Sequence, residues 1–201
     1  MRYTLPHRTP CLVTNSAAAG PNLYLIHHGQ TSASGMHCNG LQDQQLDDIG
    51  QAEAQVLAQE LATRALDRIY CSPQLCARQT AQAIAQDRRD TAGVALQVLV
   101  RQELTAVDRT DLVEVYHRVG RFTRELRREF DLGHRVAVVG HHWSNRMLRG
   151  ALLGATLEAT LAMSDYQPAN GSCRALWCGP HELKDPAVWC DARPDQPPGI
   201  S

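Results

Sequence analysis

The sequence predicts a three-layer α/β/α sandwich built around a largely parallel sheet. Short apolar segments rich in β-forming residues alternate along the chain with longer segments of helical periodicity. Two of the apolar segments end in histidine pairs, His27-His28 and His141-His142. The chain has 201 residues, enough for one such domain but short for two. We therefore expect a single α/β domain.

The predicted strands are short apolar runs. They cover residues 23–26, 68–71, 94–100 and 135–139, and residues 172–177 are the candidate for a last strand. The run 135–139 has a continuous apolar centre, which is typical of a strand covered on both faces. A buried, largely parallel sheet follows from this pattern.

The predicted helices lie between these strands. They cover about 48–66, 72–86, 109–131 and 144–153. The clearest is 109–131, because its apolar residues recur at steps of three and four and Gly133 ends it. For the second helix, Ser72-Pro73 supplies a cap and a proline at the first helical position. Residues 29–46 have no period and are expected to form a loop.

The ends of the chain look different from its middle. Residues 1–20 contain Pro6 and Pro10 and lack a continuous apolar stretch, so we interpret them as a flexible N-terminal arm, not a signal peptide. The domain is expected over residues 21–180, followed by an irregular C-terminal tail at 181–201. No apolar run is long enough to span a bilayer.

The cysteine content indicates the redox compartment of the protein, and the net charge restricts the classes of partner it can bind. Seven unevenly spaced cysteines argue against a disulfide framework and favour reduced thiols in a cytoplasm. The formal net charge is −1, so no basic excess is available for nucleic acid or for a membrane surface. We expect a cytoplasmic protein with a small-molecule substrate, and neither a nucleic-acid partner nor a membrane partner.

The two histidine pairs predict a site. Ligands of largely parallel sheets bind at the carboxyl ends of the strands, and both pairs stand at such ends. One pair alone would mean little, because a lone buried histidine is usually just hydrogen-bonded. Two pairs at equivalent ends favour a functional site.

Five segments in order resemble one family. Residues 23–31, LYLIHHGQT, resemble the histidine-phosphatase signature, which normally reads Arg-His-Gly after an apolar strand. Residues 70–81, YCSPQLCARQTA, are similar to Ser-Pro-x-x-Arg-Ala-x-x-Thr-Ala, and residues 136–154 to the second histidine strand and its helix. The spacing Gly40-x-x-Asp43-x-x-Leu46-x-x-x-Gly50 and the triplet Asn170-Gly171-Ser172 also fit. The chain therefore resembles the phosphoglycerate-mutase-like histidine phosphatases over about residues 22–177.

The resemblance implies roles for three residues. In the family the first histidine, here His28, attacks phosphorus, and the second, here His141, sits beside the phosphate. A carboxylic acid serves as general acid and then as general base, and Glu103 is the best candidate by position, with Glu114 second. Relatives are often dimers, so a homodimer is a further expectation.

Departures from the family pattern gather in the phosphate pocket. Three arginine positions of the family hold His27, His37 and Cys76, and the glycine after the second histidine is His142. Each lost charge-assisted contact would cost roughly 2–4 kcal/mol in the transition state. Arg78, Arg101 and Arg146 are candidate substitutes. The predicted substrate-binding residues are His27, His37, Cys76, His142 and Arg146.

The replacements share one chemical property, because imidazole and thiol groups are good ligands for Zn, Cu, Fe or Ni. The metal hypothesis names the ligand candidates His27, His28, Cys76, His141 and His142. The alternative is that Cys76 packs as a small buried residue and that His27 bonds a backbone carbonyl.

Three functions stay open from the sequence. One is an enzyme with a repurposed, metal-dependent His/Cys pocket that acts on a small molecule. The second is a divergent phosphomonoesterase, a hydrolase that works through a phosphohistidine at His28 and needs no cofactor. The third is a non-catalytic relative that binds a ligand or a partner. The sequence selects neither a substrate nor a metal.

Overall fold

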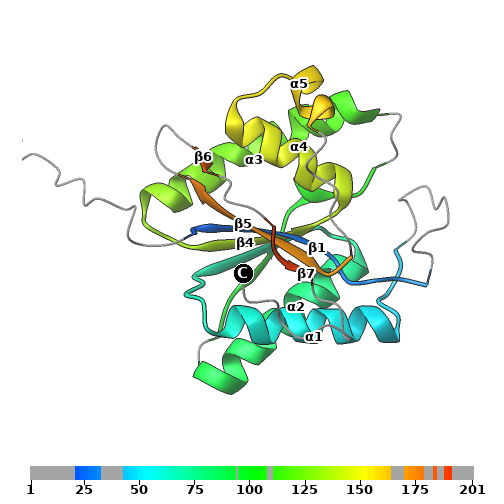
Figure 1. Cartoon of the computed structure of the whole chain (residues 1–201), viewed down its shortest axis with the longest axis vertical. Coiled ribbons are helices and arrows are strands. Elements are labelled where there is room, and N and C mark those ends of the chain that lie inside the picture. The colour runs from blue at the N-terminus through cyan, green and yellow to red at the C-terminus, as the bar shows by residue number, and fades with distance from the viewer. Residues whose placement is uncertain are drawn as a thin grey trace, which may run out of the picture.

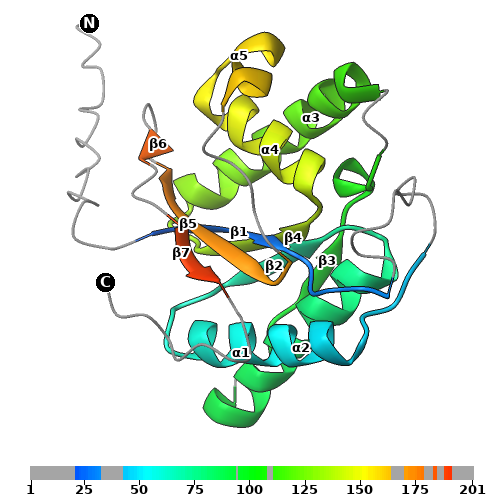
Figure 2. The same ribbon diagram turned by 45° about the vertical axis from the view of Figure 1, so that its right-hand side comes forward.

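The described part of the protein is a three-layer sandwich. The computed structural model describes residues 21–32, 43–93, 95–107, 111–163, 170–178, 183–184 and 188–191. Helices α1 (Asp48–Ala62) and α2 (Leu75–Ala92) cover one face of the sheet. Helices α3 (Leu112–Asp131), α4 (His142–Leu153) and α5 (Leu157–Ala162) lie on the other face (Figures 1 and 2). The predicted fold class is confirmed.

The strands of the described residues form one sheet. They are β1 (Leu23–His27), β2 (Arg68–Cys71), β3 (Val98–Val100), β4 (Val136–Gly140), β5 (Ser172–Cys178), β6 (Leu183–Lys184) and β7 (Val188–Asp191). Their order is β3-β2-β4-β1-β5-β6, with β7 also paired to β5. The neighbours from β3 to β1 are parallel, and β5 runs antiparallel to β1. The carboxyl ends of β2, β4 and β1 therefore meet at one edge.

Strand β1 shows how the sequence builds two cores. Its first four residues are fully or nearly buried, because helices cover both faces of the sheet. Tyr24 and Ile26 pack into the core shared with α1 and α2, whereas Leu23 and Leu25 pack into the core shared with α3 and α4. Full burial of one such side chain contributes about 1.5–3 kcal/mol. The sheet is thus fixed from both sides.

The start of α2 differs from the prediction. The helix begins at Leu75 with Gln74 as its cap residue, so the predicted cap at Ser72-Pro73 is wrong. The backbone N–H of Leu75 donates instead to the carboxylate of Asp43, 2.5 Å away and 32 residues earlier. The helix also continues to Ala92, where Gly93 adopts a positive φ of 66°.

Other boundaries move by a few residues. Helix α1 ends at Ala62, β3 shortens to three residues, and α4 already begins at His142. Helix α5 is not predicted by the sequence analysis, nor are β6 and β7 within the predicted irregular tail. None of the described helices combines the length and the apolar character that crossing a bilayer requires.

Candidate active site

The site begins where three neighbouring strands end. His28 follows β1, Ser72 follows β2, and His141 follows β4. Backbone hydrogen bonds lock these ends together, because the N–H of His28 donates to Gly140 O (3.2 Å) and the N–H of Ser72 donates to Val139 O (2.9 Å). The rule for parallel sheets thus brings the two predicted histidines to one edge.

One ring nitrogen of His28 is hydrogen-bonded, and the other keeps its lone pair. Its Nδ1 lies 2.7 Å from the carbonyl oxygen of Gly29, which can only accept a hydrogen bond. Nδ1 therefore carries the proton of the neutral ring, and Nε2 keeps a lone pair. Desolvation by burial lowers the pKa of His28 more than this hydrogen bond raises it. The ring is thus held in the uncharged form that a nucleophile or a metal ligand needs.

His141 faces His28 as a second neutral imidazole. The two ring centroids are 4.9 Å apart in an edge-on arrangement. Nε2 of His141 lies 2.9 Å from the hydroxyl of Ser72 and 3.2 Å from the amide oxygen of Gln74. The side chain also accepts from the backbone N–H of Ser144 in a capping box, so Nε2 is the nitrogen that bears the hydrogen. Burial lowers the pKa of His141 well below its ordinary value, and repulsion from His28 and His27 in their protonated forms would lower it further.

The loop that carries His28 passes close to the start of α1. A Cβ on Gly29 would lie 2.3 Å from the carbonyl oxygen of Gly50, so only glycine fits this approach. Thr80 accepts a hydrogen bond from the N–H of Gly29 (3.1 Å), and the carbonyl of His28 accepts one from Gly171 (2.9 Å). These contacts fix the backbone on both sides of the His28 ring.

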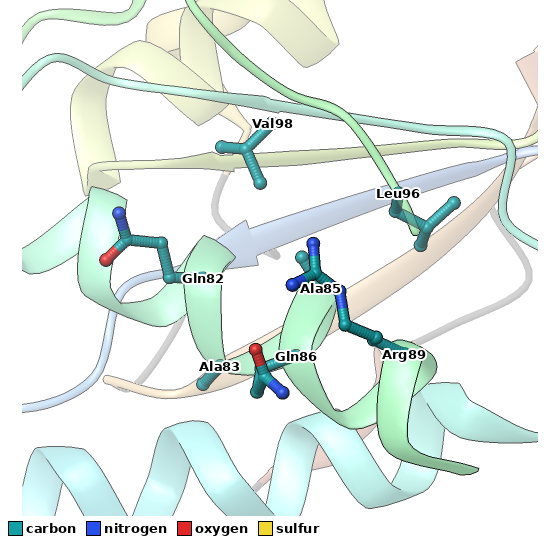
Figure 3. Close-up of a pocket in the computed structure, with 7 residues that line it drawn as sticks. All are labelled: Gln82, Ala83, Ala85, Gln86, Arg89, Leu96 and Val98. Carbon is teal, nitrogen blue, oxygen red and sulfur yellow. The ribbon is translucent and has the colours of Figure 1, made fainter. Parts of the chain in front are cut away.

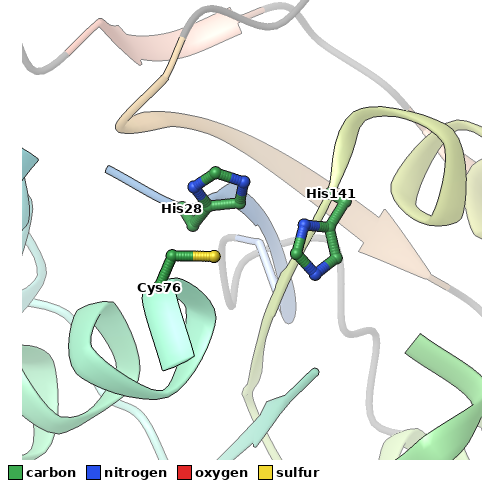
Figure 4. A group of neighbouring side chains, drawn as sticks. All are labelled: His28, Cys76 and His141. Carbon is green, nitrogen blue, oxygen red and sulfur yellow. The ribbon is translucent and has the colours of Figure 1, made fainter. Parts of the chain in front are cut away.

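Cys76 is the third member of the cluster. It is the second residue of α2, is only 5% exposed, and packs with Leu46 and Ala54. Its sulfur and one nitrogen from each of His28 and His141 all lie within 4.8 Å of one another. Figure 4 shows the thiol and the two rings turned toward one another. Burial raises the pKa of the Cys76 thiol to about 11. Cys76 therefore packs in the core and also lines the site.

Other predicted ligands stand outside this group. The ring of His27 lies beside that of His28, with centroids 4.7 Å apart, and the ring of His142 packs edge-on against Trp143. Neither contributes a donor atom to the three-residue cluster. His37 lies outside the described residues. Of the five proposed metal ligands, the structure brings His28, Cys76 and His141 together.

Two of the three candidate substitute arginines have other partners. Arg146 is buried, and its guanidinium donates to the carbonyls of Thr160, Leu161 and Met163 at the end of α5. This anchoring differs from the substrate-binding role predicted for it. Arg101 pairs with Glu125 (2.5 Å) and lies over the ring of Tyr70. Arg78 is exposed on α2.

The two candidate acids differ in their surroundings. Glu103 is half-buried on a short 3-10 helix, η2 (Gln102–Leu104), directly after β3. The next turn of this segment reaches the site, because the N–H of Ala106 donates to the Gln74 oxygen that also contacts His141 (3.3 Å). Glu114 instead pairs with Arg118 one turn along α3, on an exposed face. Of the two, Glu103 lies on the segment whose backbone contacts the site.

Ser72 and Gln74 are site residues that the sequence analysis did not identify. It assigned Ser72 to a helix cap, yet Ser72 directly follows the carboxyl end of β2. The strand-end rule that predicted both histidines would therefore have identified it. Gln74 has no comparable signal, because only the fold shows that its amide reaches His141.

A separate hollow lies away from this cluster. Its volume is about 620 Å³, and it is open to solvent between α2 and the edge strand β3 (Figure 3). Its lining residues are Gln82, Ala83, Ala85, Gln86, Arg89, Leu96 and Val98. A lining with one ionisable side chain and no nucleophile offers little for catalysis. We therefore place the chemistry at His28, not in this hollow.

Comparisons with known proteins agree with this fold. Residues 23–108 match the family model of the histidine phosphatase superfamily (branch 1). A comparison with curated proteins gives no match.

Solved structures with the same fold include three phosphatases. The mycobacterial glucosyl-3-phosphoglycerate phosphatase, in a complex with VO3, is 20% identical, with 78% of this chain and 90% of that chain covered and a TM-score of 0.65. The alpha-ribazole phosphatase from Shigella flexneri is 20% identical, with coverages of 83% and 95% and a TM-score of 0.66. The phosphoserine phosphatase from Entamoeba histolytica, in complex with 3-phosphoglyceric acid, is 18% identical, with coverages of 83% and 95% and a TM-score of 0.65. The resemblance to the histidine phosphatase superfamily is therefore confirmed, on sequence for residues 23–108 and on fold for the described domain.

Proposed function

We propose that this protein is a phosphomonoesterase of small molecules that works through a phosphohistidine at His28. The observation that carries the proposal is the hydrogen bond from Nδ1 of His28 to the Gly29 carbonyl. It leaves the Nε2 lone pair on the side of the ring that faces His141. A neutral, oriented imidazole is what nucleophilic attack on phosphorus requires.

The reaction has two steps. In the first, Nε2 of His28 forms a bond to phosphorus while the ester P–O bond breaks, and Glu103 gives its proton to the departing alcohol. In the second, water attacks the phosphohistidine and Glu103 takes the proton of that water, which restores the free ring and releases phosphate. A bound phosphate dianion would raise the pKa of His141 and so favour the protonated form of its ring.

Weak binding of the phosphate group is part of the proposal. In the free protein His28 and His141 are both held neutral, and the described guanidiniums of Arg101 and Arg146 have other partners. Neither Arg101 nor Arg146 is therefore available as the fixed positive charge that usually holds a phosphoryl group through transfer. We expect slow turnover with a high KM.

Replacing the nucleophile tests the proposal. The chelator-treated protein is assayed with phosphoserine, 3-phosphoglycerate and sugar phosphates, compounds of the class that the three structural relatives are named for. His28→Asn should lower kcat/KM about a thousandfold or more, because the attacking nitrogen is gone. Cys178→Ala is the control, since Cys178 is a buried cysteine of β5 outside the site, and it should keep wild-type turnover. Equal rates in wild type and His28→Asn would contradict the proposal.

A metal-dependent reaction is the second candidate, and the three converging donor atoms favour it. A zinc-class ion at His28, Cys76 and His141 would supply positive charge and an activated water in place of the histidine nucleophile. Chelation would then abolish turnover and added metal would restore it. Absence of turnover both with and without metal would instead favour a non-catalytic relative that binds a ligand or partner. A cytoplasmic location and a homodimer stay predictions from the sequence.

A further inference from the structure

Three donor atoms from distant parts of the chain converge at the site. They come from His28 after β1, from Cys76 at the start of α2 and from His141 after β4, and they lie within 4.8 Å of one another. Cys76 and His141 are nearly inaccessible to solvent, so their donor atoms are held in place by the surrounding core. Such convergence needs three separate elements and is not a product of local sequence.

Both histidines have the outer contacts that metal-binding imidazoles use. Nδ1–H of His28 donates to the Gly29 carbonyl, and Nε2–H of His141 donates toward Ser72 and Gln74. Metal-ligating histidines generally donate their second N–H to a carbonyl, carboxylate or hydroxyl in this way, which fixes the ring orientation and the tautomer. Each ring then presents its remaining lone pair to the cluster. For His141 a bound ion would compete with the capping contact from the Ser144 N–H.

The dimensions suit a four-coordinate ion. Zinc lies about 2.0–2.1 Å from nitrogen and about 2.3 Å from sulfur, so the donors of a tetrahedral site are roughly 3.3–3.8 Å apart. The donor atoms lie within 4.8 Å of one another, so binding of the ion draws them together by about an ångström. Three protein ligands leave a fourth position for water or for a phosphate oxygen.

The donor types select the class of ion. A thiolate and two imidazoles favour zinc and its neighbours, whereas magnesium and calcium prefer oxygen ligands. Cys76 is the second residue of α2, so its sulfur lies at the amino-terminal end of that helix. The helix dipole stabilises a thiolate there once a cation is present.

We infer that His28, Cys76 and His141 form a binding site for one zinc-class divalent ion, and that the bound ion blocks phosphoryl transfer at His28. The second part of this inference, that the ion blocks phosphoryl transfer, rests on the proposed function. It follows because Nε2 of His28 has a single lone pair, which cannot both coordinate a metal and attack phosphorus. The family resemblance implies an arginine at the motif position held by Cys76, and on that expectation a phosphate-binding group is replaced by a metal ligand.

Cobalt titration tests the site without any need for turnover. The full chain is stripped with chelator and titrated with Co²⁺, and zinc affinity is measured by competition. Wild type should bind one equivalent and show thiolate-to-cobalt charge-transfer absorption. Cys76→Ser, which nearly conserves volume, should lose that absorption and bind zinc at least about tenfold more weakly. Cys178→Ala should match wild type.

A second variant is needed if circular dichroism shows that Cys76→Ser does not fold. Ser72→Ala removes one of the two outer contacts of His141, together with the hydrogen bonds between Ser72 and Gln74, and should weaken zinc binding about tenfold with the charge-transfer band retained. Absence of a thiolate band in wild type, or equal zinc affinity in wild type and Ser72→Ala, would overturn the site.

Phosphatase assays test the second part of this inference. One equivalent of Zn²⁺ should abolish turnover by chelator-treated wild type, and chelator should restore it. Faster turnover on binding would overturn the blocking and favour the metal-dependent candidate. If no phosphomonoester is turned over under any condition, both the proposed function and the inhibition by the bound ion are wrong. The cobalt titration still decides whether the metal site exists.

Discussion

Individual residues set the chemistry through contacts that their neighbours impose. The lone pair of His28 is placed by one hydrogen bond to Gly29, and the tautomer of His141 by Ser144, Ser72 and Gln74. The sequence predicted both histidines, because strand ends of a parallel sheet meet at one edge. It could not predict that Arg146 donates hydrogen bonds to backbone carbonyls at the end of α5, because such carbonyls have no signature in the sequence.

A single glycine supports the His28 loop, and its replacement is expected to be costly. A Cβ at Gly50 would lie 2.0 Å from the carbonyl oxygen and 2.6 Å from the nitrogen of Gln30, so backbone must move. Gly50→Ala should lower the free energy of unfolding by about 1–3 kcal/mol, measured by urea denaturation. Gly120→Ala is the matched control in α3, where a Cβ meets open space, and it should stabilise by about 0.5–1 kcal/mol. Equal effects of the two substitutions would show that the close approach does not restrict the loop.

At the scale of elements, α3 is tied to β2 by one carboxylate. Glu129 accepts hydrogen bonds from Arg68 (2.8 Å), Tyr70 (2.9 Å) and His134 (2.6 Å). Burial alone would raise the pKa of Glu129, but these hydrogen bonds outweigh it and hold the pKa below its ordinary value. The same contact, with burial, raises the pKa of the Tyr70 hydroxyl.

This ion cluster predicts a pH dependence of stability. Because the folded pKa of Glu129 lies below the unfolded one, its contribution is complete above about pH 5 and is lost as pH falls through the folded value. Between pH 5 and pH 3, the free energy of unfolding of Glu129→Gln should therefore decrease less than that of wild type. Denaturant titrations at each pH measure this, with Glu158→Gln, an exposed glutamate on α5, as control. Parallel curves for wild type and Glu129→Gln would exclude the contribution.

Elements with strong local patterns were predicted well, and those fixed by distant contacts were not. Helix α3 follows from its apolar period, and β1, β2 and β4 from their apolar runs. The start of α2 was wrong because Asp43, far away in sequence, caps it. Helix α5 has six residues, too few to display a helical period.

For the molecule as a whole, the alternation of strands and helices was enough to predict the layers. The meeting of His28 with His141 followed from that topology, whereas the approach of the Cys76 sulfur depends on where α2 begins and which face it buries. Topology therefore predicted that His28 and His141 lie together, whereas only the packing of α2 shows that the Cys76 thiol lies beside them.

The attachment point of the phosphoryl group tests the central claim most directly. Chelator-treated protein is mixed with a slowly hydrolysed phosphomonoester, quenched in alkali during turnover, and mapped by peptide mass spectrometry. The proposed function predicts a phosphoryl group on His28 and none on His141. Hydrolysis with the label on Cys76 or on another side chain, or without any labelled intermediate in wild type, would contradict it.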